Sequence, residues 1–394
     1  MELKSYVLNL ITLLITTEKR MLRKLLFPVF IACLMLSSCA HKNENEEWSL
    51  MTDSLRYATL LNIARADSFV LVTINDPWTQ KQVLHRYVLV PEASPMPKNF
   101  PEGTLLRTPL RRAIMHNAVH AALVEELGCA ASIKGICDVE YVKSSGLCQL
   151  LESGTISDAG SSVMSDVERY IAMRTDAVFA SPLEQNTYGT LEKARIPIVE
   201  CADYMETSAL GRAEWIRFFG LLFDCEERAN QIFAQVERDY LQFRDAVQGV
   251  AKRPRLMVDM QSSSAWNMPG GKSYLGQLFS DAGADYVLVG DDSSGSVPLS
   301  FEQAYQYAVD ADVWLIKNAR TGGLSYEILK REQPSSAKFA PWKKRTVFFC
   351  NTLANDYYER IPYHPEILLR ELAHIFHPDC FTDTLTSPYF LPLK

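Results

Sequence analysis

The chain has 394 residues, of which 47% are apolar and 22% are charged, so it is long enough to bury one large core or two cores of medium size. Nothing in this composition indicates disorder. The formal net charge of −7 offers no basic stripe for a phosphate backbone, which argues against nucleic acid as a partner.

The N-terminus is typical of an export and lipidation signal. Two basic residues precede an apolar run over residues 25–36, which is too short to span a bilayer and suits a secretory signal. The run ends in Leu-Ser-Ser-Cys, which is similar to a bacterial lipobox, with Cys39 as the residue that takes a diacylglycerol. We expect a signal peptide over residues 1–38, a lipid anchor with a tether over 39–66, and a body held at a membrane surface. A second methionine, Met21, opens a better signal than Met1 does, so the true start stays open.

Seven further cysteines follow the lipobox, and none of them forms a CxxC pair, so neither a zinc ribbon nor a redox motif is indicated. Cys129, Cys137 and Cys148 lie close together in the sequence and could include a disulfide in an oxidising envelope. The sequence does not decide whether they do.

The body begins with two β-rich runs around an Asn-Asp-Pro turn, which predict a β-hairpin within residues 67–91. Helical and strand-like segments then alternate up to residue 207: a helix over about 110–127, a strand near 133–136, a helix leading into the strand "DAVFAS", and the strand "IPIVEC". This alternation predicts a parallel sheet covered by helices on both faces. Residues 67–207 are therefore expected to form an N-terminal lobe that includes the hairpin.

A long helical stretch follows over residues 208–250, with a break expected near Asp224. In its second half, apolar residues recur every three to four positions, which predicts one buried stripe. A helix of about 20 residues spans about 30 Å, enough to pass from one lobe to another. Strands and helices alternate again over residues 251–394 and predict a C-terminal lobe. The predicted fold is α/β, with two Rossmann-like lobes, one joining helix and an extra N-terminal hairpin.

Two segments, residues 164–180 and 299–316, share one skeleton at a constant offset of 134 residues. Each has a possible N-cap residue, a glutamate two positions later (Glu168 and Glu302), and an Asp-Ala pair eight positions after that glutamate. A carboxylate in the first helical turn interacts favourably with the helix dipole by about 0.3–1 kcal/mol, so capping alone accounts for each glutamate. A duplicated unit would account for the shared spacing.

Several longer segments carry a family resemblance through their order and spacing. They are "LGCAASIKGI", "ISDAGSSVMSDVERYIAMRTDAVFAS", "GGKSYLGQLFSDAGADYV", "SFEQAYQYAVDADVWLI" and "NDYYERIPYHPEILLRELAHIFHP". Together with the lipobox, they resemble the class III substrate-binding proteins of ABC importers, which bind ferric siderophores, haem or cobalamin. The resemblance covers roughly residue 107 to the C-terminus, and Thr175-Asp176 stands where the family usually has Pro-Asp.

This resemblance implies a non-enzymatic receptor in which a single rigid helix joins the lobes and the ligand, an iron chelate or a corrinoid, lies in the cleft between them. It also implies that one glutamate on each lobe docks onto arginines of the membrane permease, and Glu168 and Glu302 occupy those positions. No covalent cofactor other than lipid is expected. The implied location is the cell envelope, at the periplasmic face of the inner membrane if the cell is Gram-negative.

Candidate ligand-binding residues are aromatic and polar side chains in loops that follow strand ends, because open α/β sheets bind ligands there. They are Gln185, Tyr188, Trp266, Asn267, Arg320, Tyr357 and Arg360. An arginine in the cleft would indicate an anionic ligand such as a ferric chelate or a propionate.

Two other functions stay open. A direct zinc or manganese receptor would need histidines and carboxylates that converge, and His116 and His120 have an i,i+4 spacing that can bind metal. A surface enzyme would need a nucleophile, yet the chain has no GxSxG motif and no catalytic residue can be named. The stretch "PGGKS" is not a phosphate loop, because the Walker pattern requires glycine five residues before Gly271, where Trp266 stands.

Overall fold

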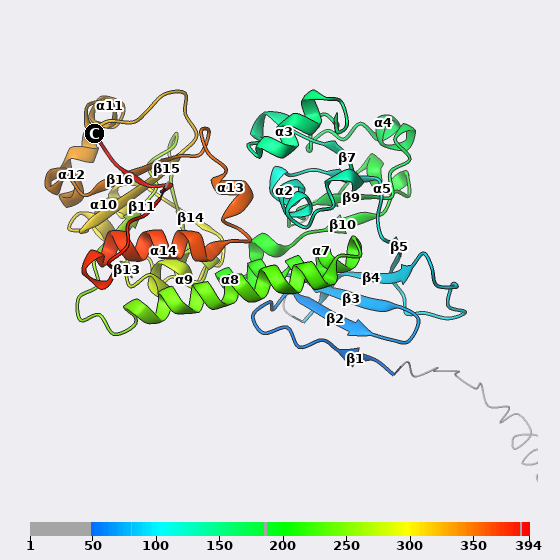
Figure 1. Ribbon diagram of the computed structural model, residues 1–394. Coiled ribbons are helices and arrows are strands. Elements are labelled where there is room, and N and C mark those ends of the chain that lie inside the picture. The colour runs from blue at the N-terminus through cyan, green and yellow to red at the C-terminus, as the bar shows by residue number, and fades with distance from the viewer. Residues whose placement is uncertain (1–48, 80, 185–186, 387) are drawn as a thin grey trace, which may run out of the picture. The chain divides into compact units, whose positions relative to one another are not determined.

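Each of the two lobes is built around its own five-stranded sheet (Figure 1). The computed structural model describes residues 49–79, 81–184, 187–386 and 388–394, of which residues 50–394 belong to one unit. The expected signal peptide and the lipidated Cys39 lie outside the described residues. Within the described residues, no helix is both long enough and apolar enough to span a membrane.

The sheet of the first lobe has the order β10-β9-β6-β7-β8, and all its strand pairs are parallel. Its elements are β6 (Ala113–Met115), α2 (Ala118–Glu126), β7 (Ile133–Ile136), α3 (Ser145–Glu152), β8 (Ser157–Asp158), α4 (Val167–Ala172), β9 (Ala177–Ala180), α5 (Thr190–Lys193) and β10 (Ile198–Glu200). The helix expected over 110–127 begins only at Ala118. The three residues of β6 are fully buried and form the central strand, and their apolar run is too short to be told from helix by its pattern.

The sheet of the second lobe has the order β13-β11-β15-β16-β17, in which only β17 runs antiparallel to its neighbour. A separate antiparallel pair is formed by β12 and β14. The elements are β11 (Arg255–Val258), β12 (Trp266–Pro269), α9 (Tyr274–Asp281), β13 (Asp285–Tyr286), β14 (Ser296–Leu299), α10 (Phe301–Ala308), β15 (Val313–Asn318), α11 (Tyr326–Glu332), α12 (Ala340–Lys344), β16 (Val347–Asn351), α13 (Tyr357–Arg360), α14 (Pro365–Phe376) and β17 (Leu391–Pro392).

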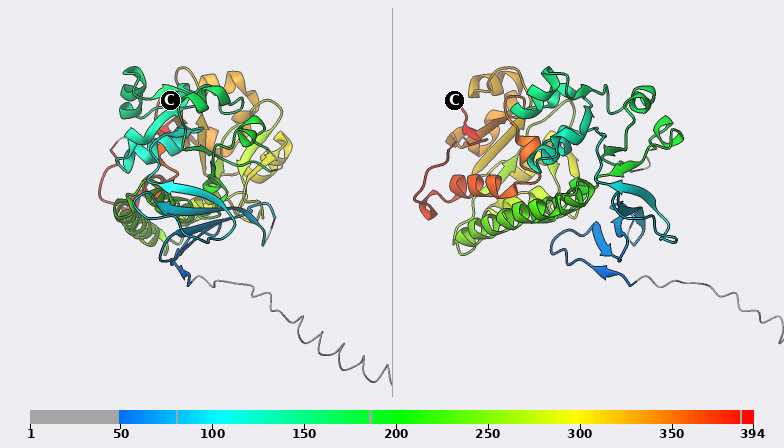
Figure 2. Two further views of the ribbon diagram at one scale, coloured as in Figure 1. Left: turned by 90° about the vertical axis from the view of Figure 1, so that its right-hand side faces the viewer. Right: turned by 45° about the vertical axis from the view of Figure 1, so that its right-hand side comes forward.

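Helix α8 (Glu226–Val247) joins the lobes, after the shorter helices α6 (Ala209–Glu214) and α7 (Ile216–Leu222). The chain breaks between α7 and α8, as expected near Asp224. At its start α8 is tied to the first lobe, where Nε of Arg228 donates to the carbonyl oxygen of Glu126 at 2.8 Å. Further along, the hydroxyl of Tyr240 donates to Asp281 of the second lobe at 2.7 Å. Figure 2 shows α8 running below both lobes, so the predicted two-lobed α/β fold with one joining helix is confirmed.

The N-terminal region is larger than the expected hairpin. Five strands form one sheet in chain order: β1 (Met51–Thr52), β2 (Leu61–Arg65), β3 (Val70–Asn75), β4 (Val83–Pro91) and β5 (Thr104–Thr108). The expected hairpin is the β3–β4 pair. A tether that reaches residue 66 is therefore wrong, because β1 and β2 belong to the sheet and Leu61 and Ile63 are buried in its core.

Two buried carboxylates fasten the N-terminal segment to the start of the joining helices. Glu214 accepts the backbone N–H groups of Arg56, Tyr57 and Ala58 at 2.8–3.0 Å. Glu206 accepts those of Thr59 and Leu60 at 2.9–3.1 Å. Both glutamates are at most 1% exposed, so these charges are buried only because backbone donors surround them.

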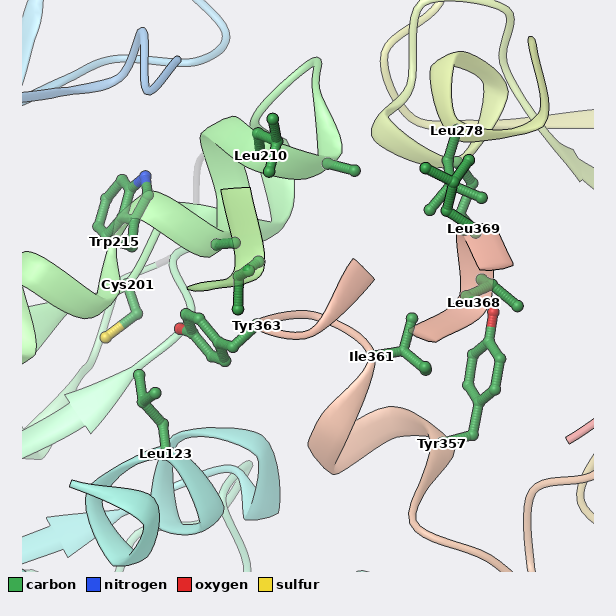
Figure 3. Close-up of a cluster of buried hydrophobic side chains, with 14 of the residues drawn as sticks. Leu123, Cys201, Leu210, Trp215, Leu278, Tyr357, Ile361, Tyr363, Leu368 and Leu369 are labelled. Carbon is green, nitrogen blue, oxygen red and sulfur yellow. The ribbon is translucent and has the colours of Figure 1, made fainter. Parts of the chain in front are cut away.

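One apolar core runs through both lobes beneath the space between them. Tyr363, in the connection from α13 to α14, reaches from the second lobe toward Leu123 and Cys201 of the first (Figure 3). On its other side, Ile361 and Leu368 continue the same cluster into the second lobe. The lobes are therefore held together by packing as well as by α8.

Candidate ligand-binding site

A hollow of about 330 Å³ opens between the two lobes, where strands of both sheets end. Its first-lobe lining follows β6 and β7, and part of its second-lobe lining follows β15 and β16. The lining residues used below are His116, Asp138, Tyr141, Lys143, Arg212, Thr352, Asn355, Asp356, Tyr358 and Glu359. Open α/β sheets bind ligands beyond the carboxyl ends of their strands, so this hollow, called the cleft from here on, is the candidate site.

Arg212 of α6 supplies a fixed positive charge to the cleft. The residue is only 8% exposed, its Nε donates to Oδ2 of Asp203 at 3.0 Å, and its guanidinium lies 4.8 Å from the ring centre of Tyr274. Oδ1 of Asp203 also pairs with Nε2 of His120 at 3.1 Å. Although burial works to raise it, the neighbouring Arg212 and His120 hold the pKa of Asp203 below its usual value. The guanidinium is thus charged and held in one orientation.

Two exposed tyrosines line the cleft from opposite lobes. Tyr141 of the first lobe is 62% exposed and Tyr358 of the second is 56% exposed. His116, which also lines the cleft, is buried, and this burial lowers its pKa to about 4, so its ring is neutral at physiological pH. The cleft therefore offers aromatic surface on both sides together with the guanidinium of Arg212. Its lining also contains Lys143 and the carboxylates of Asp138, Asp356 and Glu359.

Two polar atoms of cleft residues have no hydrogen-bond partner among the described residues: Oγ1 of Thr352 and Oε2 of Glu359. Both residues are more than nine-tenths buried. The other carboxylate oxygen of Glu359 accepts the backbone N–H of Lys143 across the cleft at 2.7 Å. Burial raises the pKa of Glu359. Buried polar atoms are nearly always satisfied in native proteins, so these two are candidate partners for a ligand or a bound water.

A second hollow of about 630 Å³, called the side hollow, adjoins the cleft and shares Lys143, Asn355, Asp356 and Glu359 with it. It lies between α2 and α3 of the first lobe and the residues around α13 of the second. Nε2 of His364 meets Glu126 here at 2.7 Å, while Nδ1 pairs with Glu366 at 2.9 Å. Burial opposes the shift, but the two glutamates raise the pKa of His364 to about 9. A charged histidine thus bridges the lobes beside the cleft.

Of the described candidates from the sequence, only Arg360 lines either hollow. Two aromatic candidates are core residues: Trp266 is 1% exposed, with Nε1 donating to Val258, and Tyr357 is 3% exposed and packs against Tyr389. Neither ring is exposed or lines the cleft in this structure, because each is packed into the core of the second lobe. Gln185 lies outside the described residues.

The remaining candidates have partners or positions away from the cleft. The guanidinium of Arg320 is paired with Glu332 at 2.9 Å. Tyr188 donates its hydroxyl to Glu200 at 3.2 Å. Asn267 is exposed on β12 and lines neither hollow.

The residues that the sequence missed often stand next to those it named. Tyr358 follows Tyr357 on one short helix, and no sequence pattern tells which of two adjacent tyrosines faces the core. Arg212 carried a usable signal, since it is a charge within an apolar helical segment. Tyr141 lies in a short 3-10 helix, Val139–Tyr141, in the connection that follows β7, and nothing in the sequence marks it apart from other tyrosines in such connections.

The two glutamates of the repeat are exposed in the first turns of α4 and α10. The described residues provide no hydrogen bond or ion pair to Glu168 or Glu302. Asp166 and Ser300 cap these helices as expected. A third helix has the same arrangement: Ser325 caps α11, and the exposed Glu327 follows it by two residues.

The "PGGKS" glycines have a packing role. A Cβ on Gly271 would lie 2.3 Å from the carbonyl oxygen of Leu288 and 2.5 Å from that of Asp291. Within the described residues there is no group of three or more His, Cys, Asp or Glu side chains that could hold a metal ion. His116 precedes α2 and does not share its helical face with His120.

Comparisons with known proteins agree with this geometry. A family model described as periplasmic binding protein matches residues 140–350. An uncharacterized lipoprotein of Methanocaldococcus jannaschii is 25% identical over 364 residues, which cover 86% of each chain. The structure of an ABC-type Fe3+-hydroxamate transport system from Saccharomonospora viridis matches with a TM-score of 0.54 at 19% identity, over 68% of this chain and 94% of that one. A molybdate-binding periplasmic protein of Haemophilus influenzae matches with a TM-score of 0.57 at 16% identity, over 70% of this chain and 89% of that one.

Two α/β lobes, one joining helix and a cleft at the strand ends are the arrangement of solute-binding receptors, a class of proteins that are not enzymes. The family match covers more than half of the chain, so the protein belongs to the periplasmic binding protein family. It is the substrate-binding component of an ABC transporter, and such components bind small molecules outside the cytoplasm and work with permease subunits.

Proposed function

We propose that the cleft captures a metal chelate, either an iron chelate (siderophore or haem) or a corrinoid such as cobalamin, and that the protein delivers it to its permease. An anionic iron chelate fits the guanidinium of Arg212 best. The observation that carries this proposal is the lining of the cleft, in which Tyr141 and Tyr358 face the same space from opposite lobes beside Arg212. Tyrosine rings stack on flat ligand groups, and a guanidinium binds carboxylates or hydroxamate oxygens with paired hydrogen bonds.

The size of the site supports a ligand larger than a bare ion. The cleft of about 330 Å³ and the adjoining side hollow of about 630 Å³ each fall within the range of small-molecule sites, roughly 300–1,000 Å³. Oγ1 of Thr352 and Oε2 of Glu359 would accept hydrogen bonds from donor groups of the same ligand, since neither atom has a partner among the described residues. A simple oxyanion would use Arg212 but would leave both tyrosines without a role.

A direct zinc or manganese receptor is the alternative, and the described residues offer it no converging ligand set. Molybdate is a further candidate because a structural neighbour binds it. A ligand screen should therefore contain ferric siderophores, haem, cobalamins, molybdate, Zn²⁺ and Mn²⁺, each added to the purified chain and read by thermal unfolding. At 100-fold excess over Kd, a true ligand adds about 2.7 kcal/mol of stability.

Variants of the cleft separate these ligand classes. Tyr141→Ala and Tyr358→Ala should each weaken chelate binding roughly 3- to 10-fold, the size of an aromatic contact. Tyr307→Ala is the matched control, because Tyr307 is an exposed tyrosine on α10 that lines neither hollow. Arg212→Lys keeps the charge but loses the paired donors, so it should weaken an anionic chelate more than a neutral one. Binding of molybdate or Zn²⁺ with all the chelates silent would overturn the proposal.

We further propose that Cys39 carries the lipid anchor, at the periplasmic face of the inner membrane in a Gram-negative cell, and that Glu168 and Glu302 dock onto arginines of the permease. Both glutamates are exposed and unpaired among the described residues, which leaves their charges available. Exposed ion pairs contribute about 0–1 kcal/mol each, so they would set orientation and encounter rate more than affinity. Charge reversal by Glu168→Lys with Glu302→Lys should slow association with the permease in lipid nanodiscs. Glu327→Lys, at the equivalent helical position of α11, should not.

A further inference from the structure

Two cysteines far apart in the sequence meet where the first lobe joins α8. Cys129 follows the C-terminal end of α2, and Cys225 directly precedes α8. Sγ of Cys129 lies 3.9 Å from the carbonyl oxygen of Phe223, which precedes Cys225 by two residues. The bond from Arg228 to the carbonyl of Glu126, at 2.8 Å, holds the same two chain segments together. The structure shows both cysteines as free thiols that are partly exposed.

The other cysteines of the described residues have different surroundings. Cys137 is buried against the hydroxyl of Tyr170, Cys148 donates to the carbonyl of Val142, and Cys201 is fully buried. Cys350 is buried beside Asn355, and Cys380 is exposed with no cysteine beside it among the described residues. The three cysteines that are close in sequence, Cys129, Cys137 and Cys148, thus point to different neighbours.

We propose that Cys129 and Cys225 are oxidised to a disulfide in the exported protein. The proposal rests on export to an oxidising envelope, which belongs to the proposed function. The oxidant is a protein disulfide of the envelope: one thiolate of the pair attacks it to form a mixed disulfide, and the second thiolate then displaces the oxidant's sulfur. One S–S bond forms in the pair and one breaks in the oxidant, which takes up two electrons and two protons and leaves as a dithiol.

The disulfide closes a loop from residue 129 to residue 225 and fixes the C-terminal end of α2 to the start of α8. A long closed loop of this kind restricts the unfolded chain strongly. Burial, together with the neighbouring Cys129, raises the pKa of Cys225 to about 12. Such a thiol stays protonated at neutral pH and reacts slowly unless an oxidant is delivered to it, as suits a structural bond more than an exchanging one.

Differential labelling of the full chain, expressed with its own signal and recovered from a bacterial envelope, tests this directly. Free thiols are alkylated under denaturing conditions with iodoacetamide, the chain is reduced, and newly released thiols take N-ethylmaleimide. The expected result is N-ethylmaleimide on Cys129 and Cys225 and iodoacetamide on Cys137 and Cys148. Trypsin separates all four, since Cys129 lies in peptide 113–134 and Cys225 in 218–228, and these two peptides should be recovered as one linked species without reduction.

Iodoacetamide on both Cys129 and Cys225, or a linkage of Cys129 to any other cysteine, would overturn the proposal. Cys225→Ser should free Cys129 for iodoacetamide. Reduction of the unmodified chain should lower its urea midpoint, whereas reduction of the double variant Cys129→Ser, Cys225→Ser should leave the midpoint unchanged. Export is checked separately by lipid labelling of the same material. A chain that is exported but unlinked refutes the disulfide alone, and a chain that is not exported refutes the envelope function.

Discussion

The carboxylate of Glu214 is the acceptor around which the N-terminal segment folds, and its removal should release that segment. Three backbone N–H groups, from Arg56, Tyr57 and Ala58, donate to a side chain that is fully buried. Hydrogen bonds to a charged group contribute about 1.5–3 kcal/mol each, which gives a ceiling near 9 kcal/mol for the three. The segment can lift away and expose its donors to water, so we expect a loss of about 3–5 kcal/mol for Glu214→Ala.

Glu214→Gln keeps one acceptor oxygen but turns an amide donor toward backbone donors, so about half of that loss, roughly 2–3 kcal/mol, is expected. Urea unfolding of the purified chain measures it, and trypsin cleavage after Arg56 reports release of the segment. Glu327→Gln is the matched control, an exposed glutamate whose loss should change stability by less than about 0.5 kcal/mol. If Glu214→Gln unfolds within 0.5 kcal/mol of the unmodified chain, the sheet is not held by this carboxylate and the reasoning fails.

Three further predictions each concern the stability of the chain after one substitution. His364, charged in the bridge to Glu126, has a folded pKa of about 9 against 6.5 unfolded, because the stabilising glutamates outweigh burial. Its contribution is complete below pH 6.5 and is lost as pH rises through 9, so urea unfolding should show about 3 kcal/mol less stability at pH 10 than at pH 6, a slope that His364→Gln removes. Burial raises the pKa of Glu371 from 4.5 to about 7, so the folded chain holds this proton more tightly than the unfolded chain does. The free energy of unfolding should therefore fall by about 3 kcal/mol as pH rises from 4.5 to 7, and Glu371→Gln should remove this fall. Gly271→Ala should destabilise the chain by about 1–3 kcal/mol through collision with backbone carbonyls, whereas Gly290→Ala, with nothing near its Cβ direction, should not; equal melting temperatures would contradict the packing role.

The architecture could be predicted from the sequence because alternating strands and helices and the stripe on α8 are local patterns. Seven apolar residues recur at helical spacing on this helix, and five of them, Ala229, Phe233, Val236, Tyr240 and Val247, are buried. The other two, Ile232 and Phe243, are half-buried. The N-terminal sheet could not be predicted in full, because β1 has only two residues and the segment after it is held by carboxylates about 150 residues away. Such long-range acceptors leave no mark in the sequence around residues 51–60.

The sequence predicted where the cleft lies but not which residues line it, because the lining also depends on packing between distant segments. The loops after β15 and β16 do line it, through Ala319, Thr352 and Leu353. Whether a loop side chain faces the cleft or the core depends on the residues that pack against it. Trp266 packs against Trp314 and Phe339, and Tyr357 packs against Tyr389, so both belong to the core. Strand-end rules therefore locate a site to within a few residues but do not choose between neighbours.

The repeat that contains Glu168 and Glu302 is not in the same register throughout the folded chain. Asp176 directly precedes β9 and accepts the backbone N–H of Arg112 at 2.9 Å. The residue that does the same before β15 is Asp312, which accepts the N–H of Arg255 at 3.1 Å, and not Asp310. Helix α10 is two residues longer than α4. The two units therefore align at their N-caps with an offset of 134 residues, but at the start of their strands with an offset of 136.

This difference in offset narrows what the repeated glutamates can mean. A capped helix with a glutamate two residues later occurs in α4 and α10, and again in α11, where Glu327 has no counterpart in the repeat. Because three helices have this arrangement, the favourable interaction with the helix dipole is enough to explain it, and docking rests on the family resemblance and not on the spacing. The docking proposal then depends on a difference among three chemically equal glutamates. Charge reversal at Glu168 and Glu302 must slow association with the permease while reversal at Glu327 does not; equal effects at all three would reduce the pattern to helix capping.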